Sequence, residues 1–156
     1  MLRYDDTVPD DLRALADEAW ADFLGALPGR QDCISEPTLS AEWELETRAE
    51  YQPDTAVVTV RVPGTPATLR SELLHEFAHH LEFTCPDQQQ MRQTFLVAQD
   101  FAADTSWFDG DSWEATPSEQ YAEAVVELIE GRRTHQGGIQ LTDDAIDVVR
   151  VWGRGP

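Results

Sequence analysis

The residues with the clearest chemical potential in this sequence are His75, Glu76 and His79, which form the motif H-E-x-x-H. If this stretch is helical, the two histidines lie about 40° apart around the helix, so both imidazoles can reach one metal ion. Glu76 then points to the side of that metal, where its carboxylate can hold and deprotonate a water molecule. An isolated histidine beside an apolar stripe is more often structural, but the complete motif favours metal binding.

A catalytic zinc ion needs a third protein ligand and one open position for water. Cys85 stands where the pattern H-E-x-x-H-x-x-G-x-x-H has its third histidine. The same pattern requires a glycine where this sequence has Glu82, so Cys85 is disfavoured as a ligand. The other common solution is a glutamate from a later helix, and this sequence offers one.

The segment Pro117–Ile129 is predicted to be a helix that is apolar around most of its circumference. Its remaining edge is acidic and consists of Glu119, Glu123, Glu127 and Glu130. Ser118 is the expected N-cap, which would put Glu119 in the first turn, where a negative charge is favoured. The alternative interpretation of this edge is a solvated acidic face without a ligand.

The motif H-E-x-x-H at 75–79, followed by E-x-x-A-E-A at 119–124, resembles the pattern of gluzincin-type zinc metallopeptidases. The similarity is closest to the catalytic domain of anthrax lethal factor and looser to the ImmA/IrrE peptidases. The resemblance implies a minimal zincin fold and a Zn²⁺ cofactor held by His75, His79 and Glu119. It also implies that Glu123, the less favoured of the two glutamates as a ligand, orients one of the histidines, and that the substrate is a peptide or protein.

In such an enzyme Glu76 is the general base that takes a proton from water and passes it to the leaving amine. Zincins lay an extended substrate against an edge strand, and Val57–Val62 is the strand expected to provide that edge. The residue that stabilises the oxyanion stays open. Tyr121 and His135 are candidates, together with Arg132–Arg133, although a surface role is the more typical one for a histidine in the polar loop around position 135.

Three aromatic residues between the two motifs, Trp107, Phe108 and Trp113, can either line a substrate cleft or pack in the core. His80 follows the second motif histidine, but its angle around the helix places it off the metal edge. A structural role is therefore expected for His80.

The alternative to an enzyme is a zincin-fold structural or adaptor protein, such as a virion component. Such a protein would keep the zinc site, would have protein assembly partners and would not turn over a substrate. The unassigned oxyanion stabiliser favours this alternative. A purely structural zinc site fits less well, because it does not need the base Glu76.

The hydrophobic pattern predicts one α+β domain over residues 1–156, with an N-terminal helix, a small sheet, the motif helix and the glutamate helix. Alternating apolar and acidic residues predict a half-buried strand over Trp43–Tyr51, and Ala56–Val62 is a second, more apolar strand. Helices are expected at Asp10–Leu27, Thr68–Phe83, Gln88–Ala103, Pro117–Ile129 and Asp143–Trp152, with an irregular segment at Asp104–Thr116.

The chain of 156 residues has 30 acidic and 11 basic residues and a net charge of −19. All 11 basic residues are arginine. This charge would repel phosphates, so no nucleic-acid partner is expected. The composition resembles that of haloarchaeal and haloarchaeal-virus proteins. No signal peptide, transmembrane span or membrane partner is expected, which predicts a cytoplasmic or virion-associated protein. Cys33 and Cys85 could form one disulfide, but reduced thiols are favoured for an intracellular protein.

Overall fold

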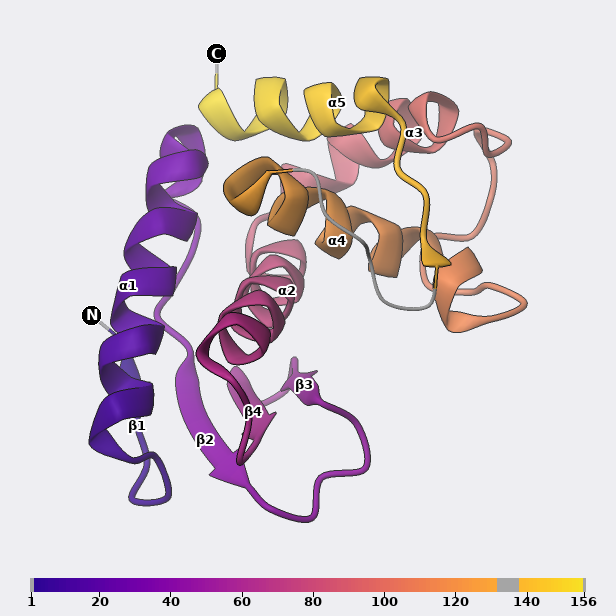
Figure 1. Ribbon diagram of the computed structural model, residues 1–156. Helices are drawn as coiled ribbons and strands as arrows, with labels where there is room; N and C mark the ends of the chain where they lie inside the picture. The colour runs from indigo at the N-terminus through magenta and orange to yellow at the C-terminus, as the bar shows by residue number, and fades with distance from the viewer. Residues whose placement is uncertain (1, 132–137, 156) are drawn as a thin grey trace.

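The computed structural model describes residues 2–131 and 138–155, in which helices pack beside a small sheet (Figure 1). The strands in these ranges are β1 (Arg3–Tyr4), β2 (Thr38–Glu42), β3 (Ala49–Gln52) and β4 (Val57–Arg61). The α-helices are α1 (Asp10–Ala26), α2 (Pro66–Thr84), α3 (Gln88–Ala98), α4 (Pro117–Glu130) and α5 (Asp143–Arg154). Two 3₁₀ turns complete them, η1 (Pro28–Arg30) and η2 (Trp113–Ala115). The predicted α+β class is confirmed.

The sheet has the strand order β1-β2-β4-β3. Strands β1, β2 and β4 are parallel, whereas β3 runs antiparallel to β4. Leu39, Val58 and Tyr51 are neighbours across three strands, and the first two are buried in the core. Since β3 pairs only with β4 in the described part of the chain, it forms one edge of the sheet.

The predicted strand over Trp43–Tyr51 is wrong for its first six residues. Strand β2 ends at Glu42, β3 begins at Ala49, and the residues between them form bends. Because β4 lies between β2 and β3, the chain must cross from one side of β4 to the other, and residues 43–48 make this crossing. Trp43 is consequently 74% exposed although the alternation assigns it to the core face.

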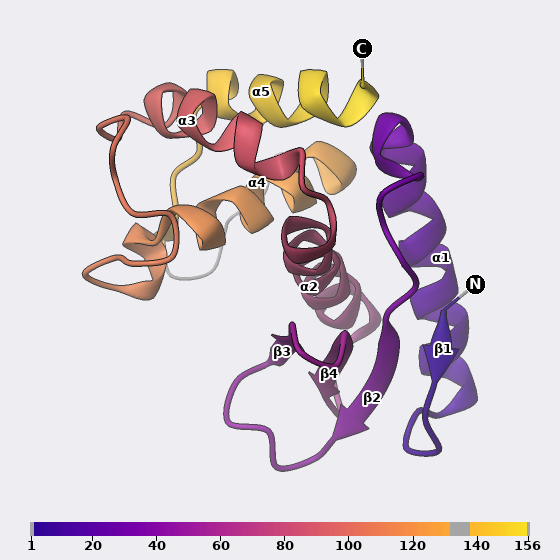
Figure 2. The same ribbon diagram turned by 180° about the vertical axis from the view of Figure 1, so that it is seen from behind.

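Helix α2 lies between the sheet and α4, with α1 along its side (Figures 1 and 2). Pro66 and the Thr65 side chain, which accepts a hydrogen bond from the Thr68 amide, start the helix. Phe77 packs edge-on against Trp20 and Phe23 of α1, at ring distances of 4.9 and 5.9 Å. These contacts fix the rotation of α2, so that its opposite side faces α4.

Helices α3 and α5 pack on each other, and α5 also packs on α4 (Figure 2). The expected helix from Gln88 ends at Ala98, five residues earlier than predicted. Asp100 has a positive φ of 63°, a conformation that does not continue an α-helix. The other helices have the predicted positions to within a few residues.

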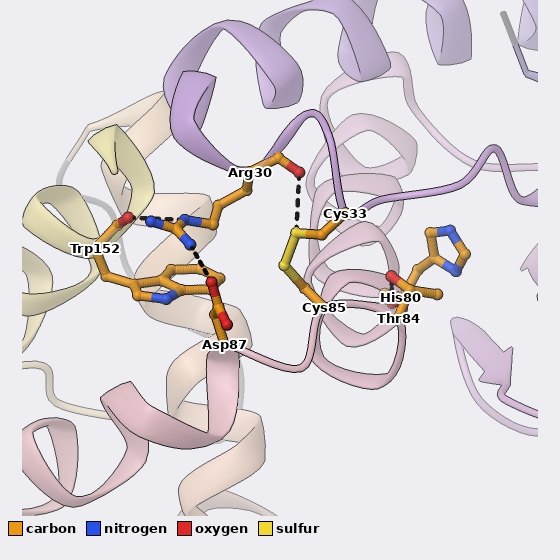
Figure 3. Close-up of a disulfide and its surroundings, with 7 residues drawn as sticks. All are labelled: Arg30, Cys33, His80, Thr84, Cys85, Asp87 and Trp152. Atoms are coloured by element: carbon orange, nitrogen blue, oxygen red, sulfur yellow. Dashed lines mark hydrogen bonds and ion pairs between the residues drawn. A yellow bond between two sulfur atoms is a disulfide. The ribbon is translucent and has the colours of Figure 1, made fainter. Parts of the chain in front are cut away.

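Cys33 and Cys85 form a disulfide, so the expectation of reduced thiols is wrong (Figure 3). Cys85 directly follows α2, and Cys33 follows η1, 52 residues earlier. Beside the disulfide, the buried Arg30 donates hydrogen bonds to the Trp152 carbonyl at 2.9 Å and the Asp87 carboxylate at 3.2 Å. The disulfide therefore joins the end of α2 to the segment after η1, and Arg30 joins η1 to α5.

Within residues 2–131 and 138–155, no helix combines the length and the apolar character that crossing a membrane requires.

Candidate metal centre

Two helices supply the predicted ligands. His75 and His79 lie one turn apart on the side of α2 that faces α4, and Glu119 lies in the first turn of α4. Pro117 starts α4 at a position where its missing N–H group costs no hydrogen bond. The structure therefore brings all three predicted ligands together, and among the described residues they form a group that could hold a metal ion.

The three ligand atoms converge on one point. His75 Nε2 lies 3.0 Å from Glu119 Oε2 and 3.1 Å from His79 Nε2, and His79 Nε2 lies 3.4 Å from the same carboxylate oxygen. Ligand atoms bound tetrahedrally to zinc at 2.0–2.1 Å are about 3.3 Å apart. The observed spacing therefore fits a zinc-sized cation.

A carboxylate behind each histidine fixes the direction in which that histidine can bind. The Nδ1 atom of His75 lies 2.9 Å from Glu123, and the Nδ1 atom of His79 lies 3.1 Å from Glu82. Carboxylates accept hydrogen bonds, so Nδ1–H donates to the carboxylate in both rings, and a ring that carries this proton alone presents its Nε2 lone pair to Glu119. Three acceptors converging on one point repel one another unless a cation lies between them.

Glu123 occupies the predicted orienting position, but sequence reasoning missed Glu82. The Glu82 carboxylate is buried and accepts hydrogen bonds from the Ser118 hydroxyl at 2.8 and 3.0 Å and from the Trp107 indole. Its position three residues after His79, on the same helix face, was the one available signal. Ser118 therefore does not cap α4 as predicted, since its hydroxyl is directed to Glu82 and Thr116 is the N-cap residue.

The carboxylates of this cluster favour positive charge on the two histidines. Burial lowers the pKa of His75, but hydrogen bonds to Glu119 and Glu123 outweigh this effect and raise the pKa to about 10. For His79, burial is likewise outweighed by Glu119 and Glu82, and the pKa rises to about 9. Burial acts to raise the pKa of Glu119, yet its two histidine partners hold it well below the ordinary value. In the metal-free site, protons supply the positive charge.

Glu76 lies next to the three predicted ligands but is not one of them. It is 6% exposed and lines the cleft that contains His75, His79 and Glu119, whose volume is about 570 Å³. Burial raises the pKa of Glu76, and the positive charges of His75 and His79 counteract only part of this rise. A carboxylate with a raised pKa beside a metal site is suited to accept and return a proton.

Of the residues first considered as oxyanion stabilisers, Tyr121 is the one that the structure describes. Tyr121 is fully buried, with its ring 6.2 Å from Phe95 and 5.9 Å from Trp107, and it does not line the cleft. His135 and Arg132–Arg133 lie outside the described residues. Among the described cleft residues, Arg48 carries the one guanidinium group, and sequence reasoning missed it.

The predicted edge strand is also wrong. Strand β4, which corresponds to Val57–Val62, lies between β2 and β3, so both of its edges are paired. The edge next to the cleft is β3, because Ala49, Glu50 and Tyr51 line it. Whether β3 or β4 forms the edge depends on the strand order of the sheet, which local sequence patterns do not encode.

The remaining predicted residues divide between cleft and core. Phe108 and Trp113 line the cleft, whereas Trp107 is buried and donates to Glu82. His80 is fully buried and contacts the Tyr51 hydroxyl and the Ser35 carbonyl, as expected for a structural residue. Glu130 lies at the end of α4 and pairs with Arg70 at 3.3 Å, away from the ligands.

Comparison of the chain with protein-family models, with curated proteins and with solved structures finds no match. The positions of the residues are therefore what identifies the site. That geometry places a group that could hold a metal ion next to the buried carboxylate of Glu76.

Proposed function

We propose that this chain is a zinc-dependent endopeptidase with a minimal zincin fold. The observation that carries the proposal is the convergence of His75, His79 and Glu119 on one point, with Glu76 next to them in an open cleft. Structural zinc sites have four protein ligands, whereas catalytic sites have three and leave one position open. Three ligands at the wall of a cleft correspond to the catalytic arrangement.

The residues of the chain have separate roles in this proposal. A zinc ion held by His75, His79 and Glu119 would supply Lewis-acid chemistry for a water molecule and the scissile carbonyl. Glu76 accepts the proton of the attacking water and delivers it to the amine nitrogen as the C–N bond breaks. Glu123 and Glu82 hold the Nδ1 protons of the two histidines, so the Nε2 atoms keep their lone pairs for the ion.

The edge strand β3 is the proposed place for the substrate backbone. Its outer edge has no partner strand in the described part of the chain, and an extended peptide can pair with such an edge. Arg48 precedes this strand and is 52% exposed, with Glu72 at 3.8 Å as a weak partner. Its guanidinium is the proposed stabiliser of negative charge on the substrate carbonyl.

The burial of Tyr121 supports one alternative, a zincin-fold structural or adaptor protein that keeps the metal site. In that case the chain binds zinc and does not hydrolyse peptides. The two candidates share the metal site and differ only in turnover.

One experiment separates them. The zinc-loaded protein is incubated with an unstructured protein such as casein at high salt, because the acidic composition resembles that of salt-adapted proteins. The endopeptidase produces fragments, and Glu76→Gln lowers the rate about 10²- to 10⁴-fold while it still binds zinc. Glu130→Gln, a matched carboxylate change on α4 outside the cleft, keeps the wild-type rate. Zinc binding without fragments overturns the endopeptidase proposal and favours the adaptor.

A further inference from the structure

The cleft contains an unusual share of the exposed apolar surface. Among the described residues, six large apolar side chains are exposed, and Phe83, Phe108 and Trp113 line the same cleft as the metal ligands. The other three, Trp43, Val97 and Val151, lie outside this cleft. Single exposed apolar residues are ordinary, but a cluster of them in a cleft indicates a binding surface.

Phe83 and Phe108 form a fixed aromatic pair. Their rings stack at 5.5 Å with an interplanar angle of 18°, although each side chain is about half exposed. The Arg92 guanidinium lies 5.0 Å from the centre of the Phe108 ring and is itself held by Gln88 at 2.6 Å. The pair is therefore positioned before any ligand arrives, which reduces the entropy cost of binding.

Phe83 places the aromatic pair close to both the metal ligands and the edge strand. Phe83 follows His79 by one turn of α2, about 6 Å along the helix. On its other side, Phe83 lies 6.0 Å from the ring of Tyr51 in β3. A peptide paired with β3 would direct every second side chain into the cleft, toward these rings. Trp113 stacks on His75 at 5.9 Å, at the opposite end of the ligand pair.

We propose that Phe83 and Phe108 form the subsite that selects a large apolar side chain, aromatic above all, next to the reacting bond of a peptide substrate. The proposal rests on the endopeptidase function and names the substrate class of that site. The rings offer apolar area and stacking faces to such a side chain. An acidic side chain is disfavoured, because Glu72, Glu119 and Glu123 line the same cleft.

The test uses hydroxamates, which bind a zinc ion with an open coordination position whether or not the protein turns over a substrate. N-acetylphenylalanine hydroxamate and N-acetylalanine hydroxamate are titrated into the zinc-loaded protein by isothermal calorimetry. The phenyl compound is expected to bind at least about tenfold more tightly, since partial burial of the ring accounts for a factor of this size. In Phe83→Ala and in Phe108→Ala the ratio of the two affinities falls to about one to two.

Two controls keep the result specific. Trp43→Ala removes an exposed aromatic residue outside the cleft and keeps the wild-type affinity ratio. Phe83→Leu preserves helix α2 and gives an intermediate ratio, and thermal unfolding shows whether each variant is folded. A wild-type ratio near one, or a tenfold ratio that survives both alanine variants, overturns the subsite.

The two proposals can fail separately. If neither hydroxamate binds to the zinc-loaded protein, the open metal position is absent and the endopeptidase proposal fails together with the subsite. If the phenyl preference is present and depends on Phe83 and Phe108 while casein stays intact, the subsite is supported and the endopeptidase proposal is overturned.

Discussion

Two adjacent histidines on α2 have opposite environments. His79 faces α4, where Glu119 and Glu82 surround it and its pKa rises to about 9 although burial acts to lower it. His80 faces the sheet, where Ser35 offers a carbonyl and Tyr51 a hydroxyl, and burial lowers its pKa. Both rings are mostly or fully buried, so burial alone does not distinguish them.

The difference between the two faces of α2 lies in their partners. Nε2–H of His80 donates to the Ser35 carbonyl at 2.6 Å, and Nδ1 accepts from Tyr51 at 3.0 Å, so the neutral ring uses both nitrogens. His79 instead donates a hydrogen bond from Nδ1–H to Glu82, and its Nε2 atom stays directed to the place where a cation could bind. The face that could hold a metal ion is thus surrounded by carboxylates, and the opposite face by neutral hydrogen bonds and the Cys33–Cys85 disulfide.

The largest expected effect is the loss of metal binding in His79→Gln. Four ligands of a zinc site together contribute about 10–16 kcal/mol, so the loss of one lowers the affinity about 10²- to 10³-fold. Elemental analysis and competition with a chromogenic chelator measure this affinity. Excess zinc raises the Tm of the wild type by several degrees through ligand binding to the folded state, and chelation reverses it, whereas the rise at the same zinc concentration is much smaller in the variant. Zinc affinity near that of the wild type would exclude His79 as a ligand.

On the opposite face, the double variant Cys33→Ser/Cys85→Ser is expected to destabilise the fold by about 2–4 kcal/mol. Without the cross-link the unfolded chain gains conformational entropy. Denaturant unfolding of the zinc-free protein measures the change, and treatment of the wild type with a reductant gives the same direction. Zinc affinity should change less than tenfold, because the disulfide lies outside the ligand cluster. A larger fall in affinity would show that the two faces are coupled.

The carboxylates behind the ligands have a smaller effect than the ligands themselves. Glu82→Gln and Glu123→Gln are each expected to weaken zinc binding about 10- to 100-fold. The neutral amide is a weaker acceptor for Nδ1–H than the carboxylate, so the histidine is held less firmly in its binding orientation. Chelator competition measures both variants, with Glu130→Gln as the control on α4. If only Glu123→Gln has an effect, His79 does not depend on Glu82 for its orientation.

Helical periodicity made most of the metal face predictable. The spacing of His75, Glu76 and His79 fixes their directions once α2 is a helix, and the resemblance supplied Glu119 and Glu123. The same geometry could have excluded Tyr121, since it follows Glu119 by two residues and so lies about 200° away around α4. Its burial among Phe95 and Trp107 agrees with that angle.

The missed features depend on contacts between segments distant in sequence. Glu82 acts on His79 only because Ser118 and Trp107 fold over its carboxylate. The edge position of β3 depends on strand order, and the pairing of Cys33 with Cys85 depends on how η1 meets the end of α2. No local pattern of residue types carries this information.

The smallest expected effect is that of His80→Gln, the matched partner of His79→Gln one residue away. Gln cannot reproduce both hydrogen bonds of the ring and leaves a buried polar group without a partner, which costs about 1–3 kcal/mol of stability. Zinc affinity should stay within about threefold of the wild type, because His80 points away from the ligand cluster. Denaturant unfolding and chelator competition on the same preparation measure the two quantities. If His80→Gln lost zinc as His79→Gln does, the two faces of α2 would form one cooperative site, and the partners of each ring would not explain their different roles.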